Sequence, residues 1–227
     1  MPKKTASEIS RIISDQTGFA IVESYKAIRA NINFAVPKQG CKKIMICSSY
    51  SGEGKTTTCI NLAITIAQTG ASVLLIDCDL RRANVHTALK IGNGAGVSNY
   101  LSGMADMDDI INASEIPNLR VATSGDIPPN PAELLARPNV GTMLKEMEEG
   151  ADYILIDTPP VCVVSDVLPM SKMCDGVILV VSHMETKHPN IREALDKLNF
   201  AGASIVGMIL NKIKIKYNYK SYYNNYY

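Results

Sequence analysis

The sequence contains no tryptophan, only three phenylalanines and no apolar run longer than a strand. A membrane-spanning helix needs about 20 consecutive apolar residues, so we expect that no segment of the chain spans a bilayer. The first residues also lack the charged start and apolar core of a signal peptide. These absences favour a cytoplasmic protein.

A cysteine framework and an excess of charge are missing as well. The six cysteines are scattered and form no Cys-x-x-Cys pair, so neither a zinc-binding spacing nor a secreted disulfide scaffold is indicated. We interpret them as reduced residues that pack in the core. The formal net charge is +1, so the composition gives no reason to expect nucleic acid as a partner. A chain of 227 residues fits one α/β domain with short appendages.

One glycine-rich stretch organises the rest of the chain. Residues 48–58 read Ser-Ser-Tyr-Ser-Gly-Glu-Gly-Lys-Thr-Thr-Thr, between an apolar run at 43–47 and a helical pattern at 57–68. A phosphate-binding loop requires this order of strand, loop and helix. Gly52 and Gly54 allow successive backbone N–H groups to point inward at a phosphate. The alternative, a glycine-rich turn that binds nothing, does not account for the Gly-Lys-Thr sequence that ends the loop.

The residue types of this loop predict how it binds a nucleotide. Lys55 is expected to face solvent in the empty loop and to reach the β- and γ-phosphates when a nucleotide binds. The hydroxyl group of Thr56 is expected to hold Mg²⁺. The residues that we predict to bind the nucleotide are Ser51, Gly52, Glu53, Gly54, Lys55, Thr56, Thr57 and Asn211.

Short apolar runs alternate with helical patterns or polar loops along most of the chain. A helix is predicted over residues 20–34, where apolar residues recur at helical spacing. Further strands are predicted at 72–76, 119–123, 153–156, 177–181 and 205–210. Continuous apolar runs are typical of parallel strands buried on both faces. We therefore predict an α/β fold of the P-loop NTPase type, with a mostly parallel central sheet and helices on both faces.

Composition divides the chain into an N-terminal arm at 1–17, one P-loop domain at 18–210 and a tyrosine-rich tail at 211–227. The tail holds six of the ten tyrosines and four lysines, but no acidic residue. It has too few aliphatic residues to build a core, so we expect it to be flexible and disordered. Within the domain, the proline-rich segment 125–131 is expected to be a loop that leads into a helix at Pro131.

Acidic residues follow two of the predicted strands. Asp77 and Asp79 come after the run at 74–76, and Asp157 comes after the run at 154–156. The carboxyl ends of parallel strands meet at the crevice where an open α/β sheet binds its ligand. Beside a phosphate loop, these carboxylates would hold Mg²⁺, directly or through water, and one could accept a proton from an attacking hydroxyl group. A single aspartate at a strand end is more often a cap or turn residue, but three beside a phosphate loop favour a catalytic site.

Together these motifs resemble those of the bacterial tyrosine kinases of capsular and exopolysaccharide synthesis, in the MinD/ParA-like P-loop superfamily. The resemblance covers residues from about 20 to the C-terminus and is most specific at 74–81, at 154–160 and in the tail. It implies that ATP and Mg²⁺ are the cofactors, that Asp79 and Asp157 serve Mg²⁺ with Thr56, and that Asp77 is the base. It also implies Lys55 as a catalytic residue and autophosphorylation between subunits at Tyr217, Tyr219, Tyr222, Tyr223, Tyr226 and Tyr227.

The same resemblance implies partners. Kinases of this kind without membrane segments work with a transmembrane polysaccharide co-polymerase, or chain-length regulator, as activator, which would place this chain at the inner face of the cell membrane. A cognate phosphotyrosine phosphatase and a ring-like homo-oligomer are also implied. Residues 23–29 resemble the assembly motif Glu-x-x-Arg-x-x-Arg, although Lys26 replaces the first arginine and lacks its bidentate fork. We therefore predict that Glu23, Lys26 and Arg29 contact a neighbouring subunit.

Two other functions are compatible with a phosphate loop. A partitioning or septum-placing ATPase of the same superfamily would carry a second lysine early in the loop, where this chain has Tyr50. A nucleotide-dependent scaffold would bind ATP without forming phosphotyrosine. The tyrosine-rich tail has no use in the partitioning ATPase, whereas in the scaffold it would bind partners.

Overall fold

The computed structural model describes residues 12–14 and 16–213, so the predicted tail tyrosines lie outside the described residues. The helices are α1 (Phe19–Ala35), α2 (Lys55–Ala67), α3 (Val85–Leu89), α4 (Val97–Leu101), α5 (Met107–Ile110), α6 (Pro131–Leu135), α7 (Asn139–Glu146), α8 (Leu168–Ser171) and α9 (His188–Phe200). The strands are β1 (Lys42–Ser48), β2 (Val73–Asp77), β3 (Ile111–Ala113), β4 (Leu119–Ala122), β5 (Tyr153–Asp157), β6 (Gly176–Ser182) and β7 (Ile205–Asn211).

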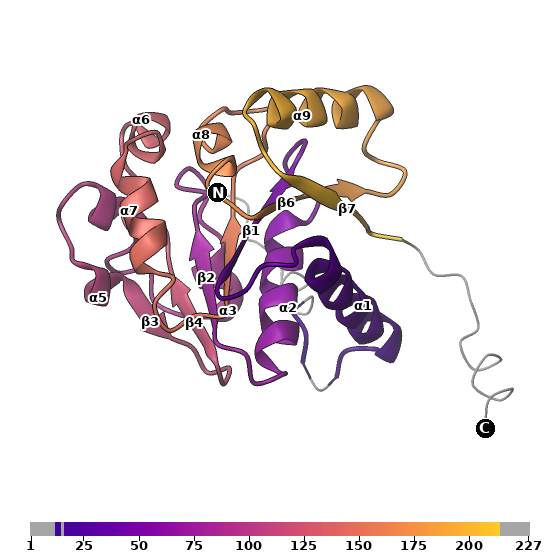
Figure 1. The fold of residues 1–227 in the computed structure, drawn as a ribbon, viewed down its shortest axis with the longest axis horizontal. Coiled ribbons are helices and arrows are strands. Elements are labelled where there is room, and N and C mark those ends of the chain that lie inside the picture. Colours follow the sequence, from indigo (N-terminus) through magenta and orange to yellow (C-terminus); the bar gives the residue numbers. More distant parts are fainter. Residues whose placement is uncertain (1–11, 15, 214–227) are drawn as a thin grey trace, which may run out of the picture.

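The described strands form one sheet in the order β3-β4-β2-β5-β1-β6-β7. All neighbouring pairs are parallel except β3 with β4. The predicted α/β fold with a mostly parallel sheet is therefore confirmed, and each predicted strand is present (Figure 1). The antiparallel edge strand β3 was not predicted, because three residues are too few to show a periodic pattern.

Helices cover both faces of the sheet. Alternate residues of the central strands point to opposite faces, so Ile44 and Ile46 of β1 pack with α1, α2 and α3, whereas Met45 and Cys47 pack with helices from α4 to α9. Each face has its own apolar core, and the residues of β6 are all buried. This burial explains why the strands appear in the sequence as continuous apolar runs.

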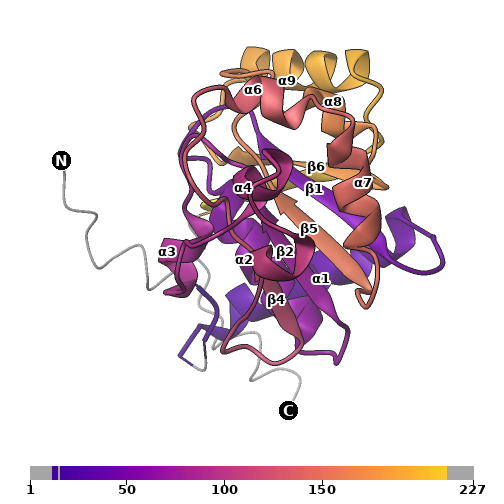
Figure 2. The same ribbon diagram turned by 90° about the vertical axis from the view of Figure 1, so that its left-hand side faces the viewer.

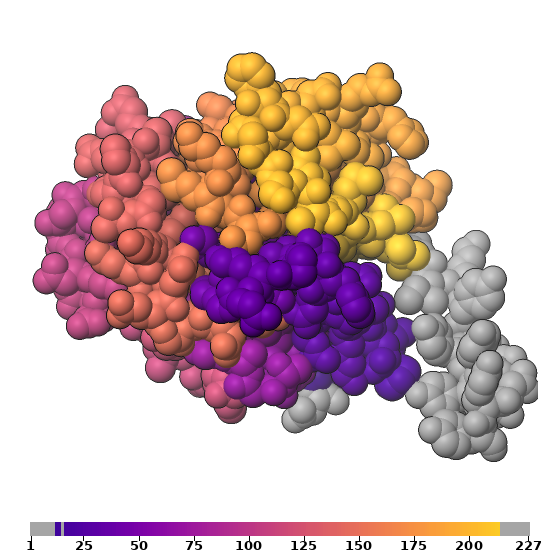
Figure 3. All heavy atoms as spheres, in the orientation of Figure 1, coloured from indigo at the N-terminus to yellow at the C-terminus, as the bar shows by residue number. Residues whose placement is uncertain are grey.

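Helix α1 packs beside α2 on one face, and Figure 3 shows the indigo surface of α1 next to the yellow surface of β7. The described part of the predicted arm also lies on this face. Its Ile13 is buried, and the Ile13 backbone N–H donates to Asn61 of α2 over 2.9 Å. The six cysteines are all free and, apart from the half-buried Cys162, buried, as predicted for packing residues. Among the described helices, none has the length and apolar character needed to cross a membrane.

The parallel strands bring four loops to one edge of the sheet. Asp77 lies opposite Asp157 in the register of β2 and β5, and Ile46 of β1 lies opposite Asp157 on the other side of β5. The loops that follow β1, β2, β4 and β5 therefore leave the sheet side by side (Figure 2). Every acidic residue predicted for the site lies at this edge, which is where open α/β sheets bind ligands.

Candidate active site at the carboxyl edge of the sheet

The loop between β1 and α2 has the backbone geometry of a phosphate cradle. Gly52 and Gly54 adopt φ angles of 87° and 93°, which residues other than glycine rarely adopt. A Cβ atom at Gly54 would lie 2.1 Å from Nδ2 of Asn211, so the Asn211 side chain would have to move to admit any other residue. Helix α2 begins at Lys55, so its unpaired N–H groups and positive dipole end point into the loop.

Lys55 does not face solvent, which corrects the sequence-based prediction. Its side chain is only 10% exposed, and its Nζ lies 3.1 Å from Asp79 Oδ2 and 3.4 Å from Asp157 Oδ1. Burial opposes the positive charge, but the carboxylates of Asp157 and Asp79 outweigh that effect and raise the pKa of Lys55. The lysine turns inward because the two buried carboxylates of Asp79 and Asp157 need a compensating positive charge.

The hydroxyl group of Thr56 completes this cluster. It donates to Asp157 Oδ2 over 2.7 Å and accepts from Lys55 Nζ over 3.2 Å. Asp157 is fully buried, and burial raises its pKa, while Lys55 and Thr56 act in the opposite direction. Thr56, Asp79 and Asp157 thus direct oxygen atoms at one point, which the ammonium group of Lys55 occupies.

This donor set fits Mg²⁺, which prefers oxygen ligands and retains several water molecules. Across residues 12–14 and 16–213, no group of three or more His, Cys, Asp or Glu side chains forms a ready-made metal cluster. A magnesium ion shared between protein oxygens and ATP phosphates does not need such a cluster. The positive charge already present among Thr56, Asp79 and Asp157 shows that these oxygens can surround a cation.

Asp77 lies at the end of β2 and is fully buried. Its Oδ1 accepts the backbone N–H of Asp79 over 3.1 Å, and its Oδ2 accepts those of Asn84 and Val85, each over 3.2 Å. Burial and the charge of Asp157 raise the pKa of Asp77 to about 7. Asp77 therefore holds the loop after β2 in place, and it is also a carboxyl group whose proton is gained or lost near neutral pH.

Glu53 links the phosphate loop to the loop after β6 and to the end of β7. Its carboxylate accepts from the backbone N–H of Tyr50 and from the hydroxyl group of Thr186, in the loop after β6. Its backbone carbonyl accepts from Asn211 Nδ2 over 3.0 Å. A cavity of about 230 Å³ lies beside this network, lined by Tyr50, Ser51, Gly52, Glu53, Glu185, Thr186, Asn190 and Lys212. Sequence reasoning included Asn211 but missed Thr186, which belongs to no motif.

Arg81 and Asp166 form a second connection that the sequence did not reveal. Arg81 Nε lies 2.6 Å from Asp166 Oδ2, and Nη2 lies 3.3 Å from Oδ1, so the contact is bidentate. Asp166 is buried, whereas Arg81 is exposed on one side. The pair joins the loop after β2 to the loop after β5, and both loops border the acidic cluster.

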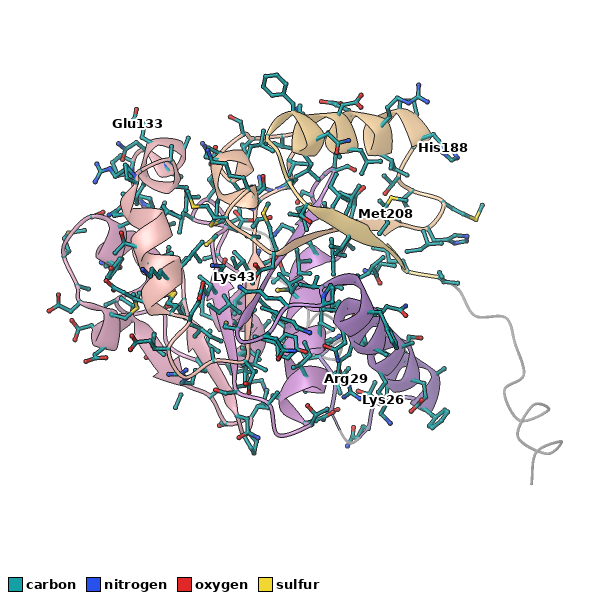
Figure 4. The ribbon with its side chains drawn as sticks, viewed as in Figure 1. Lys26, Arg29, Lys43, Glu133, His188 and Met208 are labelled. Atoms are coloured by element: carbon teal, nitrogen blue, oxygen red, sulfur yellow. The ribbon has the colours of Figure 1, made fainter. Side chains whose placement is uncertain are left out.

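The predicted assembly residues lie on α1 (Figure 4 labels Lys26 and Arg29). Lys26 pairs with Glu23 over 2.7 Å on the exposed side of the helix. Arg29 instead donates from Nη1 to the backbone carbonyl of Thr65 on α2 over 2.8 Å. Glu23 and Lys26 thus form one exposed pair, while Arg29 also fastens α1 to its own domain. Their contact with a neighbouring subunit stays a prediction.

The fold and this edge of the sheet define the chain as an α/β protein of the P-loop NTPase class. A family model described as an AAA domain matches residues 41–192. The septum site-determining protein MinD of Pyrococcus horikoshii, complexed with Mg-ADP, has a TM-score of 0.65 at 27% identity, covering 77% of this chain and 71% of that chain. These matches place the chain in the class but do not separate a kinase from a partitioning ATPase.

Proteins with higher similarity to this chain distinguish a kinase from a partitioning ATPase. Tyrosine-protein kinase YwqD of Bacillus subtilis is 39% identical, over 88% of this chain and 85% of its own. Putative tyrosine-protein kinase CapB of Staphylococcus aureus is 33% identical over 98% of both chains. The kinase domain of Escherichia coli tyrosine kinase ETK has a TM-score of 0.80 at 30% identity, covering 87% of this chain and 79% of that chain. A chimerical protein, CapA2B2, has a TM-score of 0.84 at 32% identity, covering 92% of this chain and 91% of that chain.

The chain belongs to the family of bacterial tyrosine-protein kinases. It is therefore an enzyme that transfers phosphate to protein tyrosine, and the resemblance to the kinases of capsular and exopolysaccharide synthesis is confirmed. ATP binding is implied by the family and by the P-loop fold.

Proposed function

We propose that this kinase uses Mg²⁺ and ATP to phosphorylate the tyrosines of its own C-terminal tail, between subunits, and that a membrane-bound activator controls it in capsular or exopolysaccharide synthesis and export. One observation carries the proposal. Lys55 lies within 3.4 Å of two buried carboxylates and beside the Thr56 hydroxyl, directly beneath a phosphate cradle. This arrangement supplies both a phosphate-binding cation and oxygen ligands for Mg²⁺.

Different residues of the site bind the phosphates, hold Mg²⁺ and connect the flanking loops. The backbone N–H groups of residues 51–57 and Lys55 bind the phosphates, so Lys55 exchanges its carboxylate partners for phosphate oxygens. Thr56, Asp79 and Asp157 hold Mg²⁺, which neutralises phosphate charge when bound. Arg81 and Asp166 keep the flanking loops together. Buried, preoriented charges of this kind stabilise the transferring phosphate more strongly than they would in water.

Asp77 serves as the base for the tyrosine hydroxyl. The phenolic oxygen attacks the γ-phosphorus, the bond from that phosphorus to the leaving ADP breaks, and the phenolic proton passes to the carboxylate of Asp77. Asp77 is fully buried and already accepts three backbone N–H groups, so a tyrosine cannot reach it in this arrangement. The loop after β2 therefore has to shift when the tyrosine enters.

The cavity of about 230 Å³ beside Tyr50, Thr186 and Lys212 is the place for the nucleoside part of ATP. It adjoins the phosphate loop, and Asn211 touches that loop through Glu53. Asn211 is thus a nucleotide-site residue that acts by positioning the loop. Lys212, which pairs with Glu185 over 2.6 Å, marks the start of the tail at the same place.

The charge of the tail suits repeated transfer of phosphate to its tyrosines. Four lysines between residues 211 and 227 favour entry toward an acidic crevice that holds phosphate. Each added phosphate brings about −1.5 to −2 charges, which makes the tail a poor occupant of that crevice and loosens a ring-like assembly. A transmembrane co-polymerase as activator, supported by the likeness to CapA2B2, would hold the kinase at the inner face of the membrane. A phosphotyrosine phosphatase would then remove the phosphate groups from the tail.

Mixing two variants tests transfer between subunits. Lys55→Met protein with an intact tail is combined with active protein truncated after Lys216, in the presence of ATP, Mg²⁺ and an activator fragment. Phosphate is expected on the tyrosines of the Lys55→Met partner, because only the truncated partner can catalyse. Lys55→Met alone is the control. Absence of phosphate in the mixture, while intact wild type becomes phosphorylated, would leave only transfer within one chain.

A further inference from the structure

The proline-rich segment 125–131 has no role in the function described so far, yet it leaves the sheet beside the catalytic residues. It follows β4, which pairs in parallel with β2 so that Ala122 lies opposite Ile76. The next residues along the two strands, Thr123 and Asp77, are therefore neighbours about 5 Å apart across the sheet. The Thr123 hydroxyl is buried, and it has no hydrogen-bond partner among the described residues.

Hydrogen bonds fix the start of this segment to the first turn of α4. Asn99 Nδ2 donates to Asp126 Oδ2 over 2.8 Å, and Asn99 Oδ1 accepts from the Asp126 backbone N–H. The Ser98 hydroxyl donates to the Asp126 carbonyl over 2.6 Å. Gly96 lies so close that an added Cβ would be 2.3 Å from the Gly125 nitrogen. The segment is thus a rigid platform.

Apolar side chains on this platform point outward. Ile127 is 77% exposed, and Met104, at the end of the facing segment, is 68% exposed. Between them lies a cavity of about 310 Å³ whose lining includes Ser98, Met104, Ile127, Pro128, Pro129 and Arg137. Large apolar groups held in solvent by a rigid backbone indicate a recognition surface, because binding there costs little ordering entropy.

We propose that this cavity, the proline groove, binds a tyrosine of the C-terminal tail of a second copy of the chain, while another tyrosine of that tail occupies the catalytic crevice. The inference rests on the proposed function and adds a substrate-docking site to it. A phenol ring fits against proline rings and the thioether of Met104. Asp126 lines the groove and Glu133 follows on α6 (Figure 4 labels Glu133), and both residues are exposed, so negative charge is available there to the tail lysines.

The order of strands favours the tail of another copy. The tail of the same chain starts at β7, on the opposite side of the sheet from β4 (Figure 1). Five strand spacings separate β7 from β4, or about 24 Å, so that tail would have to cross the crevice before reaching the groove. A tail from a neighbour can approach from the β4 side and cover groove and crevice together. Its successive tyrosines are one to three residues apart, about 3–11 Å when extended, so one tail can present two tyrosines to neighbouring sites.

Peptide kinetics test the groove with the full-length protein. The probe is a synthetic peptide of residues 212–227, phosphorylated with ATP, Mg²⁺ and an activator fragment. Ile127→Asp and Met104→Asp should each raise the KM for the peptide about fivefold or more, with kcat and the KM for ATP within about twofold. Phe200→Asp is the matched control, since Phe200 is 95% exposed on α9 and outside the groove. Fluorescence anisotropy of the labelled peptide, without ATP, should show the same loss of affinity.

Each outcome decides the inference. Weaker peptide binding in both groove variants, with the Phe200 variant unchanged, supports it. An unchanged KM and unchanged anisotropy in Ile127→Asp overturn it. Loss of stimulation by the activator fragment with normal peptide affinity also overturns it, because the groove would then hold the activator. If wild type binds the peptide but never phosphorylates it, the proposed function fails while the anisotropy comparison still decides whether the groove binds the tail.

Discussion

The ammonium group of Lys55 lies 3.1 Å from Asp79 Oδ2, and this contact joins the phosphate loop to the strand that carries the acidic motif. The lysine is buried with its two carboxylate partners, so the contact serves the folded protein as well as catalysis. Nucleotide binding must replace these partners with phosphate oxygens. The energetics of the site therefore depend on exchanging one set of negative charges for another.

We predict that Lys55→Met abolishes phosphotransfer and also destabilises the nucleotide-free protein. Removing the cation leaves the buried carboxylates of Asp79 and Asp157 uncompensated, which costs about 3–5 kcal/mol, or roughly 6–20 °C in Tm for a domain of this size. Thermal unfolding and phosphotyrosine mapping measure both effects. Lys172→Met, at an exposed lysine, is the control. An active Lys55→Met protein would contradict the site, and an unchanged Tm would contradict the role of the ion pair.

Asp77→Asn and Asp79→Asn should differ. Asp77→Asn is expected to bind Mg-ATP but lose most phosphotransfer, because an amide cannot take the tyrosine proton. Asp79→Asn should weaken nucleotide affinity and its Mg²⁺ dependence together, because Asp79 contributes an oxygen to the cation site. Titration calorimetry with ATP, with and without Mg²⁺, separates the two. Normal Mg-ATP binding by both variants would show that the roles are assigned wrongly.

The raised pKa of Asp77 predicts a pH dependence of stability. The native carboxyl group has a pKa of about 7, above the ordinary value of 3.8, so the native chain keeps a proton that the unfolded chain has lost between these values. The contribution of Asp77 to the free energy of unfolding therefore falls as pH rises from about 4 to about 7 and is constant above that. Urea unfolding at pH 5.5 and pH 8 measures it. Asp77→Asn should show a smaller loss between these pH values, and an equal loss would contradict the prediction.

Thr186→Val should raise the KM for ATP by about three- to tenfold, because the Thr186 hydroxyl group no longer donates to Glu53 at the phosphate loop or accepts from the Ser182 backbone N–H. Thr186 is half-buried and lies outside the two apolar cores, so the substitution leaves the packing of the domain intact. Thr186→Ser, which retains the hydroxyl group, is the matched control. Equal KM values for the valine and serine variants would remove Thr186 from the site.

The assembly prediction can now be tested without disturbing the domain. Replacing Glu23 and Lys26 together by alanine removes an exposed pair, whereas Arg29→Ala also detaches α1 from the Thr65 carbonyl. The double variant should convert an oligomer to monomers in light scattering with unchanged Tm, and Arg29→Ala should lower Tm as well. An unchanged mass for the double variant counts against the predicted interface.

The sequence predicted the strands because each is a continuous apolar run, and it predicted the acidic cluster because those runs end in Asp77 and Asp157. Contacts between segments that are distant in the sequence could not be predicted from it. The inward turn of Lys55 depends on how close the ends of β2 and β5 come to α2, and only the fold sets that distance. Thr186 and Asp166 act through partners more than 80 residues away, at Glu53 and Arg81, and neither carries a local signal.

Mapping phosphate by mass spectrometry, after incubation of the purified protein with ATP, Mg²⁺ and an activator fragment, tests the central claim most directly. Wild type is expected to carry phosphate on the tail tyrosines between Tyr217 and Tyr227, and Lys55→Met is expected to carry none. ATP hydrolysis by wild type without any phosphotyrosine would contradict the account and favour a partitioning ATPase, and ATP binding with neither reaction would favour a scaffold.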